Sequence, residues 1–262
     1  MKTVAHKAIV YGVDDGVATI TFNRPEKLNA VSELMQQEVD EAIDLAATDR
    51  SVRIIVLTGR GKAFIAGADI PTMAELTPLA FRRYGLWFRR LRQTIYNLSK
   101  PVIAAVNGYA YGGGALVAWS ADLVIASEHA KFGQQESNLG HFAGASFLPR
   151  LVGRLRASHL VLLGKPIGAV EAERLGLVNV VVPAERLEAA VLDMCDELKR
   201  KSPTALAMAK QALRIQGEAG EAVAEQYELE LEALCFSTWE LKESMHAFLE
   251  KRAPDFRGPA PS

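Results

Sequence analysis

Short runs of branched apolar residues alternate with longer segments of helical period, and this alternation constrains the fold more than any other feature of the sequence. The runs at residues 54–57, 102–106 and 123–126 have the length and composition of buried strands. Helix-period segments lie between or before them, at residues 33–46 and 78–98. Because a buried strand needs covering layers on both faces, the pattern predicts an α/β fold of repeated strand-and-helix units.

The two ends of the chain extend this core. Residues 8–11 and 17–22 flank an Asp14-Asp15-Gly16 turn, which predicts a β-hairpin. After Gly164 the pattern is mostly helical. The expected helices cover residues 169–175, 185–200, 203–216, 218–235 and 240–251, with one strand at 178–182.

Composition excludes several classes of protein. Thirty basic and 31 acidic residues give a formal charge of -1, so neither nucleic acid nor an anionic membrane is expected as the main partner. The longest apolar stretch is too short for a membrane span, and the start of the chain lacks the apolar run of a signal peptide. Cys195 and Cys235 have no metal or redox spacing and are expected to be buried thiols, while no pair of histidines has metal-ligand spacing. We therefore expect a cytoplasmic protein without a metal.

Two glycine-bearing loops, residues 63–70 and 106–114, each follow a predicted buried strand. The second ends in the triplet Gly112-Gly113-Gly114, directly before an apolar helix. Glycine lets another group approach the backbone, and the first N–H groups of a helix are unpaired and attract negative charge. If both loops converge, their N–H groups would form an oxyanion hole for a carbonyl oxygen. A tight helix–strand contact is the other interpretation of the triplet, and neither the Walker nor the dinucleotide-binding spacing is present.

The string PVIAAVNGYAYGGG at residues 101–114 resembles the signature of the enoyl-CoA hydratase/isomerase (crotonase) family. Further matches lie at residues 23–30, 66–69, 132–136 and 248–252, so the resemblance covers nearly the whole chain. It implies a crotonase-like spiral of ββα units over residues 1–200. It also implies a C-terminal helical region, residues 201–262, that forms trimers or hexamers and covers the active site. Coenzyme A would be bound as part of an acyl-CoA thioester substrate, with no separate cofactor.

The resemblance also assigns site residues by motif position. The backbone N–H groups of Ala68 and Gly113 would form the oxyanion hole, and Glu136 would move the proton. The tyrosine and tryptophan side chains near Phe88 lie where the family shapes its acyl pocket, although ordinary packing explains each of them equally well. The expected residues of the substrate and coenzyme A site are Arg24, Lys27, Leu28, Ala30, Ala66, Asp69, Ile70, Tyr109, Leu116, Gly144 and Lys251, of which Lys251 can reach coenzyme A phosphates of a neighbouring subunit.

One position bears on the reaction. Hydratases of the family supply two carboxylates, one on the helix after the glycine triplet and one in the later loop. Here the later one is present as Glu136, whereas the helix position holds Leu116 and the helix carries no acid. A single base can take a proton from C2 of an enoyl thioester and return it to C4. The sequence therefore leads us to prefer double-bond isomerisation.

Two alternatives stay open. The first is hydration, with the water held by unusual groups; His141 is near Glu136 in sequence, but a loop histidine without a catalytic task is the interpretation we favour. The second belongs to another class, a non-catalytic acyl-CoA-binding or RNA-binding relative. The balanced charge and the absence of a lysine-rich comb argue against RNA binding. The acyl group itself is not indicated by the sequence.

Overall fold

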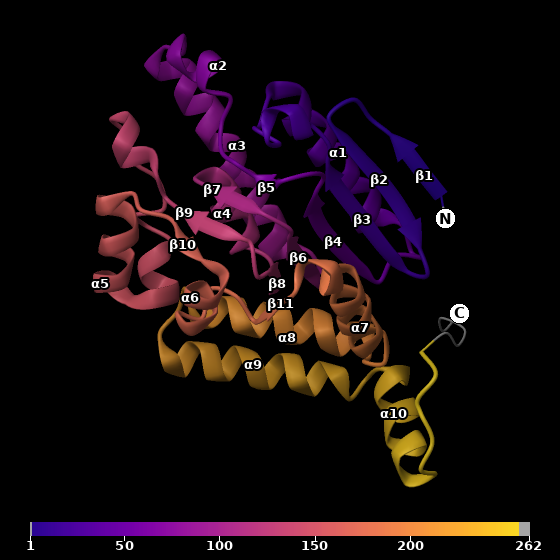
Figure 1. The fold of residues 1–262 in the computed structure, drawn as a ribbon. Helices are drawn as coiled ribbons and strands as arrows, with labels where there is room; N and C mark the ends of the chain where they lie inside the picture. Colours follow the sequence, from indigo (N-terminus) through magenta and orange to yellow (C-terminus); the bar gives the residue numbers. More distant parts are fainter. Residues whose placement is uncertain (1, 257–262) are drawn as a thin grey trace.

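The computed structural model (Figure 1) describes residues 2–256, and the side chains from residue 6 onward. Within that range the larger sheet has the strand order β1-β2-β3-β4-β6-β8-β11. Its first three strands pair antiparallel, and the rest of the sheet is parallel. The strands are β1 Lys2–Ala5, β2 Ile9–Asp14, β3 Val17–Phe22, β4 Ile54–Gly59, β6 Val102–Val106, β8 Leu123–Ser127 and β11 Val180–Val182.

The hairpin at the start of the chain forms as predicted. β2 and β3 pair from Ile9 with Phe22 to Asp14 with Val17. Asp15 and Gly16 join them with φ angles of 42° and 76°. Two consecutive positive φ values are the geometry whose twist matches that of the flanking strands, which explains the Asp-Gly turn.

Strands β4, β6 and β8 of the larger sheet are continuous apolar runs because both of their faces are buried. Alternate residues such as Ile55 and Leu57 of β4 join the main core, while Ile54 and Val56 pack with α7, Leu187–Lys199, on the other face. On the core side lie α1, Glu33–Thr48, and α3, Pro78–Asn97. Ser32 caps α1 by accepting a hydrogen bond from the Met35 amide at 3.3 Å, as its position predicts.

A second, smaller sheet lies inside the segments that the sequence indicated as loops. Its order is β10-β9-β7-β5. Each of these strands has only two or three residues, too few for a visible period. They are β5 Ala63–Ile65, β7 Tyr109–Tyr111, β9 Lys131–Gly133 and β10 Ile167–Gly168. Because β5 and β7 pair in parallel, the two glycine-bearing loops are brought side by side.

Shorter helices connect the strands. The α-helices are α2 Ile70–Ala74, α4 Gly113–Ala118, α5 Leu148–Leu163 and α6 Ala169–Arg174, and the 3-10 turns are η1 Pro25–Lys27, η2 Glu136–Leu139 and η3 Ala184–Arg186. α4 follows β7 directly and is buried along most of its length. The predicted apolar helix therefore begins two residues earlier than expected, at Gly113 inside the glycine triplet.

The C-terminal helices are α8 Pro203–Gln216, α9 Glu221–Cys235 and α10 Trp239–Leu249. α8 is tied to the core by an ion pair between Lys210 and Asp122 at 2.7 Å, and α9 packs against α8 (Figure 1). α10 projects beyond these two helices and exposes Phe248 and Leu249. A role in trimer formation stays a prediction, and residues 257–262 of the predicted helical region lie outside the described residues.

The two cysteines differ in burial. Cys195 is fully buried, but Cys235 is only half-buried, with its sulfur 3.3 Å from that of Met208, so the expectation of two buried thiols was wrong for Cys235. It lies on α9, where only one face of the helix is covered. Within the part of the chain that the structure describes, no helix has the length and apolarity required to cross a bilayer.

Candidate active site

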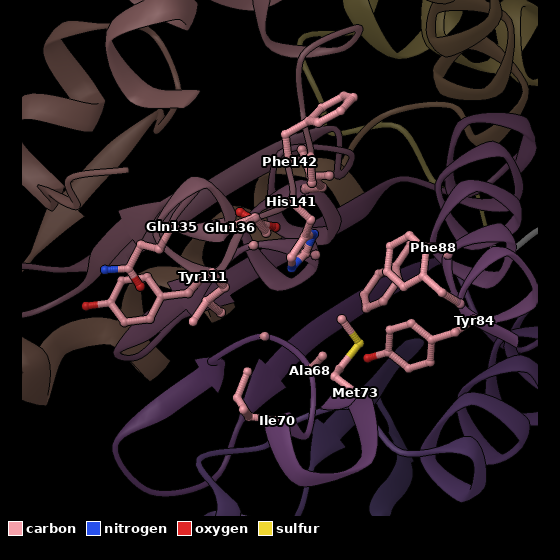
Figure 2. A pocket seen from close by; sticks show the side chains of 18 of the residues that line it. Ala68, Ile70, Met73, Tyr84, Phe88, Tyr111, Gln135, Glu136, His141 and Phe142 are labelled. Carbon is pink, nitrogen blue, oxygen red and sulfur yellow. The ribbon is translucent and has the colours of Figure 1, made fainter. Parts of the chain in front are cut away.

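The two glycine-bearing loops face one cavity of about 330 Å³ (Figure 2). Three other segments complete its wall: α2, α3, and the chain that follows β9. Tyr84 and Phe88 of α3 lie across the pocket from Glu136 and His141 in Figure 2. Of the residues predicted from the sequence, those that line the cavity are Ala66, Ala68, Ile70, Gly113, Leu116 and Glu136.

Each glycine of the triplet is required for a different reason. Gly112 has a φ of 56°, and a β-carbon there would lie 2.6 Å from Oε1 of Glu136. A β-carbon at Gly113 would overlap the ring of Phe88, and one at Gly114 would overlap a backbone carbonyl of β5. Gly114 therefore serves close helix–strand packing, whereas Gly112 and Gly113 leave room for groups that line the cavity.

The two predicted oxyanion-hole residues line the same cavity. Gly113 is the first residue of α4, so its N–H has no partner within the helix. Ala68 is held by a parallel bridge to Val31, in which the Val31 amide donates to the Gly67 carbonyl at 3.0 Å. The Ala68 N–H takes no part in that hydrogen bond. The two residues thus line one cavity from adjoining loops, and the donation of both N–H groups to one carbonyl oxygen stays a prediction.

Glu136 begins η2, directly after β9, and is half-buried in the cavity wall. Its Oε2 atom is buried and has no hydrogen-bond partner. Burial raises the pKa of this carboxyl above its ordinary value, and a hydrogen bond to its own backbone amide opposes the shift. A desolvated carboxylate with a free oxygen beside an oxyanion hole is suited to take and return a proton.

His141, which the sequence led us to interpret as a loop histidine without a catalytic task, lines the cavity together with Glu136. Its amide donates to the Glu136 carbonyl at 3.2 Å, which folds the loop back on itself. Its ring lines the cavity and meets Phe81 edge-on, with ring centroids 5.8 Å apart. Nδ1 is buried without a hydrogen-bond partner. The structure thus places a second unpaired polar atom in the cavity that contains Glu136.

The rest of the wall is mainly apolar. Leu116 is 7% exposed and occupies the α4 position at which a second carboxylate was sought. Phe88 contacts the rings of Tyr84 and Trp87 edge-on, at centroid distances of 5.5 and 4.9 Å. The Tyr84 hydroxyl donates to the Val31 carbonyl at 3.3 Å, and burial raises the pKa of that hydroxyl. These aromatic side chains of α3 therefore belong to the cavity wall as well as to the core.

Residues 24–30, which carry four of the predicted substrate and coenzyme A contacts, are bonded to the first glycine-bearing loop. Arg24 donates to the Ala30 carbonyl at 2.6 Å, and its guanidinium lies 3.6 Å from Asp69. The Leu28 carbonyl accepts from the Ala66 amide at 3.1 Å. Asp69 also caps α2. Arg24, Leu28, Ala30 and Asp69 thus support the cavity from outside its lining.

The remaining predicted residues lie farther from the cavity wall. Lys27 is exposed on η1, and Tyr109 stacks on Tyr111, which does line the cavity, with ring centroids 5.4 Å apart. Gly144 has a φ of 74° and anchors the start of α5 through its carbonyl. Lys251 is exposed after α10, which projects away from the core (Figure 1). Contact with coenzyme A, from Lys251 of a neighbouring subunit above all, stays a prediction.

Sequence reasoning missed several cavity residues, among them Met73 and Phe142. It also missed Arg89 and Arg92 of α3. A signal for Arg92 was present, because Tyr84, Phe88 and Arg92 recur at intervals of four and therefore share one helix face. Within residues 2–256 no group of three His, Cys, Asp or Glu side chains is arranged to hold a metal ion.

Comparison with known proteins agrees with this geometry. The family model described as enoyl-CoA hydratase/isomerase matches residues 12–259. A short-chain-enoyl-CoA hydratase of Clostridium acetobutylicum is 40% identical, with 90% of this chain and 92% of the relative covered. The 2,3-dehydroadipyl-CoA hydratase of Escherichia coli is 39% identical, with 92% and 95% covered. The crystal structure of an enoyl-CoA hydratase from Bacillus anthracis superposes with a TM-score of 0.92 at 32% identity, covering 97% of this chain and 100% of that one. The predicted α/β fold is confirmed.

Proposed function

Because this chain belongs to the enoyl-CoA hydratase/isomerase family, we propose that it adds water to the double bond of a 2-enoyl-CoA thioester. One observation carries the proposal. Glu136, whose desolvated Oε2 has no hydrogen-bond partner, lines the same cavity as Ala68 and Gly113. This arrangement supports a base acting next to a thioester whose carbonyl oxygen is held by two N–H donors.

The atoms balance with Glu136 as the single carboxylate. The carboxylate takes one proton from a water molecule while the water oxygen bonds to C3. The electron pair of the C2–C3 double bond then moves toward the thioester, and the two amides stabilise the negative charge on its oxygen. Glu136 returns the proton to C2, which leaves a hydroxyl on C3 and needs no cofactor.

His141 supplies the second contact that a reacting water needs. His141 lines the cavity that Glu136 lines, its Nδ1 is buried without a partner, and the hydrogen bond between the two backbones fixes the loop that carries both residues. A neutral imidazole nitrogen can accept a hydrogen bond from water or donate one to it, depending on the tautomer. In this proposal His141 holds the water, the task for which Leu116 offers no polar atom.

This conclusion revises the preference for isomerisation. The relatives described above are named hydratases, and they match this chain over nine-tenths of its length. Isomerisation remains the second candidate because of one observation: at the α4 position where a second carboxylate was expected, the cavity wall holds the apolar, nearly buried Leu116. The names of the relatives differ in their acyl groups, so the acyl group of this chain is argued below from its own residues.

The test is to incubate the protein with 2-enoyl-CoA and 3-enoyl-CoA thioesters and to follow mass. Hydration adds the mass of one water, whereas isomerisation conserves mass. We expect hydration of the 2-enoyl thioester to fall by about 10²- to 10⁴-fold in Glu136→Gln, the usual contribution of a positioned acid–base group.

His141→Ala should lower kcat for hydration by about tenfold or more, as loss of one contact to the reacting water implies. His141→Asn, which keeps a hydrogen-bonding group, is the matched variant and should recover part of that loss. Conversion of 3-enoyl to 2-enoyl thioester without any gain of mass would favour the isomerase instead. Wild-type hydration in Glu136→Gln would rule out the assigned base.

A further inference from the structure

Arg92 lies on the face of α3 that lines the active-site cavity, one turn beyond Phe88. Phe88 packs against Gly113, so it marks the position of the thioester carbonyl on the helix. Side chains four residues apart on a helix point the same way and are separated by about 6 Å along its axis. Arg92 is therefore placed farther along the cavity than the reacting carbons, on the side away from the Ala68 loop.

The guanidinium of Arg92 is half-buried among aromatic rings. It lies 4.0 Å above the ring of Phe147 and near the Tyr96 hydroxyl. Its Nε atom is buried without a hydrogen-bond partner. Among the described residues no carboxylate forms an ion pair with Arg92.

The charges around Arg92 do not supply its counter-ion. Arg89 lines the same cavity, and Arg150 is close enough to lower the pKa of Arg92, although burial is the larger cause of that shift. Removing a guanidinium from water is costly unless it is paired. Arginine also presents donors in a fork that matches both oxygens of a carboxylate. An unpaired, partly desolvated arginine in the wall of a substrate cavity thus indicates an anion on the substrate.

We propose that Arg92, assisted by Arg89, binds a carboxylate at the far end of the acyl chain, so that the substrate is an enoyl-CoA whose acyl group ends in a carboxylate. This inference rests on the proposed function for the thioester end of the molecule. Because Arg92 lies one helical turn beyond Phe88 on the cavity face of α3, the carboxylate would be bound beyond the reacting carbons.

Two thioesters of equal length test the proposal, one 2-enoyl group of six carbons ending in a methyl and one ending in a carboxylate. We expect wild-type kcat/KM to be at least about tenfold higher for the carboxylate. Arg92→Met keeps an unbranched apolar stem at this position but removes the guanidinium and its charge. It should lose about tenfold to a hundredfold on the carboxylate substrate and change less than about threefold on the methyl one. Arg92→Lys should restore part of the preference.

Arg82→Met is the matched control, because Arg82 is exposed on the same helix and does not line the cavity. It should leave the ratio between the two substrates unchanged. The subsite is overturned if wild type prefers the methyl substrate. It is also overturned if Arg92→Met lowers both activities equally or changes the mass of the assembly, since Arg92 would then serve folding or a subunit contact.

Binding of the saturated analogues, measured by calorimetry, separates this inference from the proposed function. A carboxylate preference that depends on Arg92, together with no water addition to either thioester, would refute hydration but support the anion subsite. The subsite alone would be refuted if the protein hydrates the methyl substrate but binds the two analogues with equal affinity, both in wild type and in Arg92→Met. Inhibition by free coenzyme A should be the same in wild type and Arg92→Met, because the proposed contact is with the acyl end.

Discussion

Gly113→Ala tests whether the ring of Phe88 and the oxyanion hole share one space. A β-carbon at Gly113 would lie 2.8 Å from Cδ1 of Phe88 and closer to two other ring atoms, whereas ordinary contact begins at 3.4 Å. The ring or the loop must therefore move by at least about 0.6 Å. Edge contacts with Tyr84 and Trp87 hold the ring, so the loop should yield. Gly113 has no positive φ, so backbone strain does not contribute.

The displaced loop carries the N–H of Gly113, so the cost should approach that of losing one oxyanion donor. Such a loss lowers kcat by about 10²- to 10³-fold, which corresponds to about 2.7–4 kcal/mol of transition-state stabilisation. Steady-state hydration of a 2-enoyl-CoA thioester measures it, with the expectation that kcat falls more than KM rises.

The matched variant is Gly113→Ala combined with Phe88→Leu, which shortens the side chain that blocks the methyl group. We expect the double variant to recover at least about tenfold of the lost kcat, while Phe88→Leu alone changes kcat less than Gly113→Ala does. A double variant as slow as Gly113→Ala would refute the reasoning, as would a single Gly113→Ala variant with wild-type kcat.

Two further predictions follow from buried charges. Burial raises the pKa of the Glu136 carboxyl in the folded state above 4.5, the value in the unfolded chain. The folded protein therefore loses stability as the pH rises from 4.5 through the folded pKa, because the buried carboxyl must then ionise. Glu136→Gln should raise Tm at pH 7 but not at pH 4, and the acid limb of wild-type kcat should lie above pH 4.5; an equal change in Tm at both pH values would contradict this account. Lys210→Met leaves the carboxylate of Asp122 without its partner and should lower the free energy of unfolding by about 3 kcal/mol in urea titration. The added Asp122→Asn change should recover part of that loss, and no recovery would assign the effect of Lys210 to packing.

The sequence by itself determined most strands of the larger sheet and most of the helices that cover it. β4, β6 and β8 are buried on both faces, so they appear as continuous apolar runs, and α1 and α3 show a clear helical period with capping residues. The site motifs were equally local. The glycine triplet and Glu136 could be located because their function restricts the residue type at each position.

Tertiary structure alone decided how these parts meet. The strands of the second sheet are too short to show a period, yet the pairing of β5 with β7 brings the two glycine-bearing loops together. His141 and Arg92 carried no local signal strong enough to separate a site residue from a surface one. Only the folded chain buries their nitrogen atoms beside the cavity and leaves those atoms unpaired, because burial and pairing depend on residues that are distant in sequence.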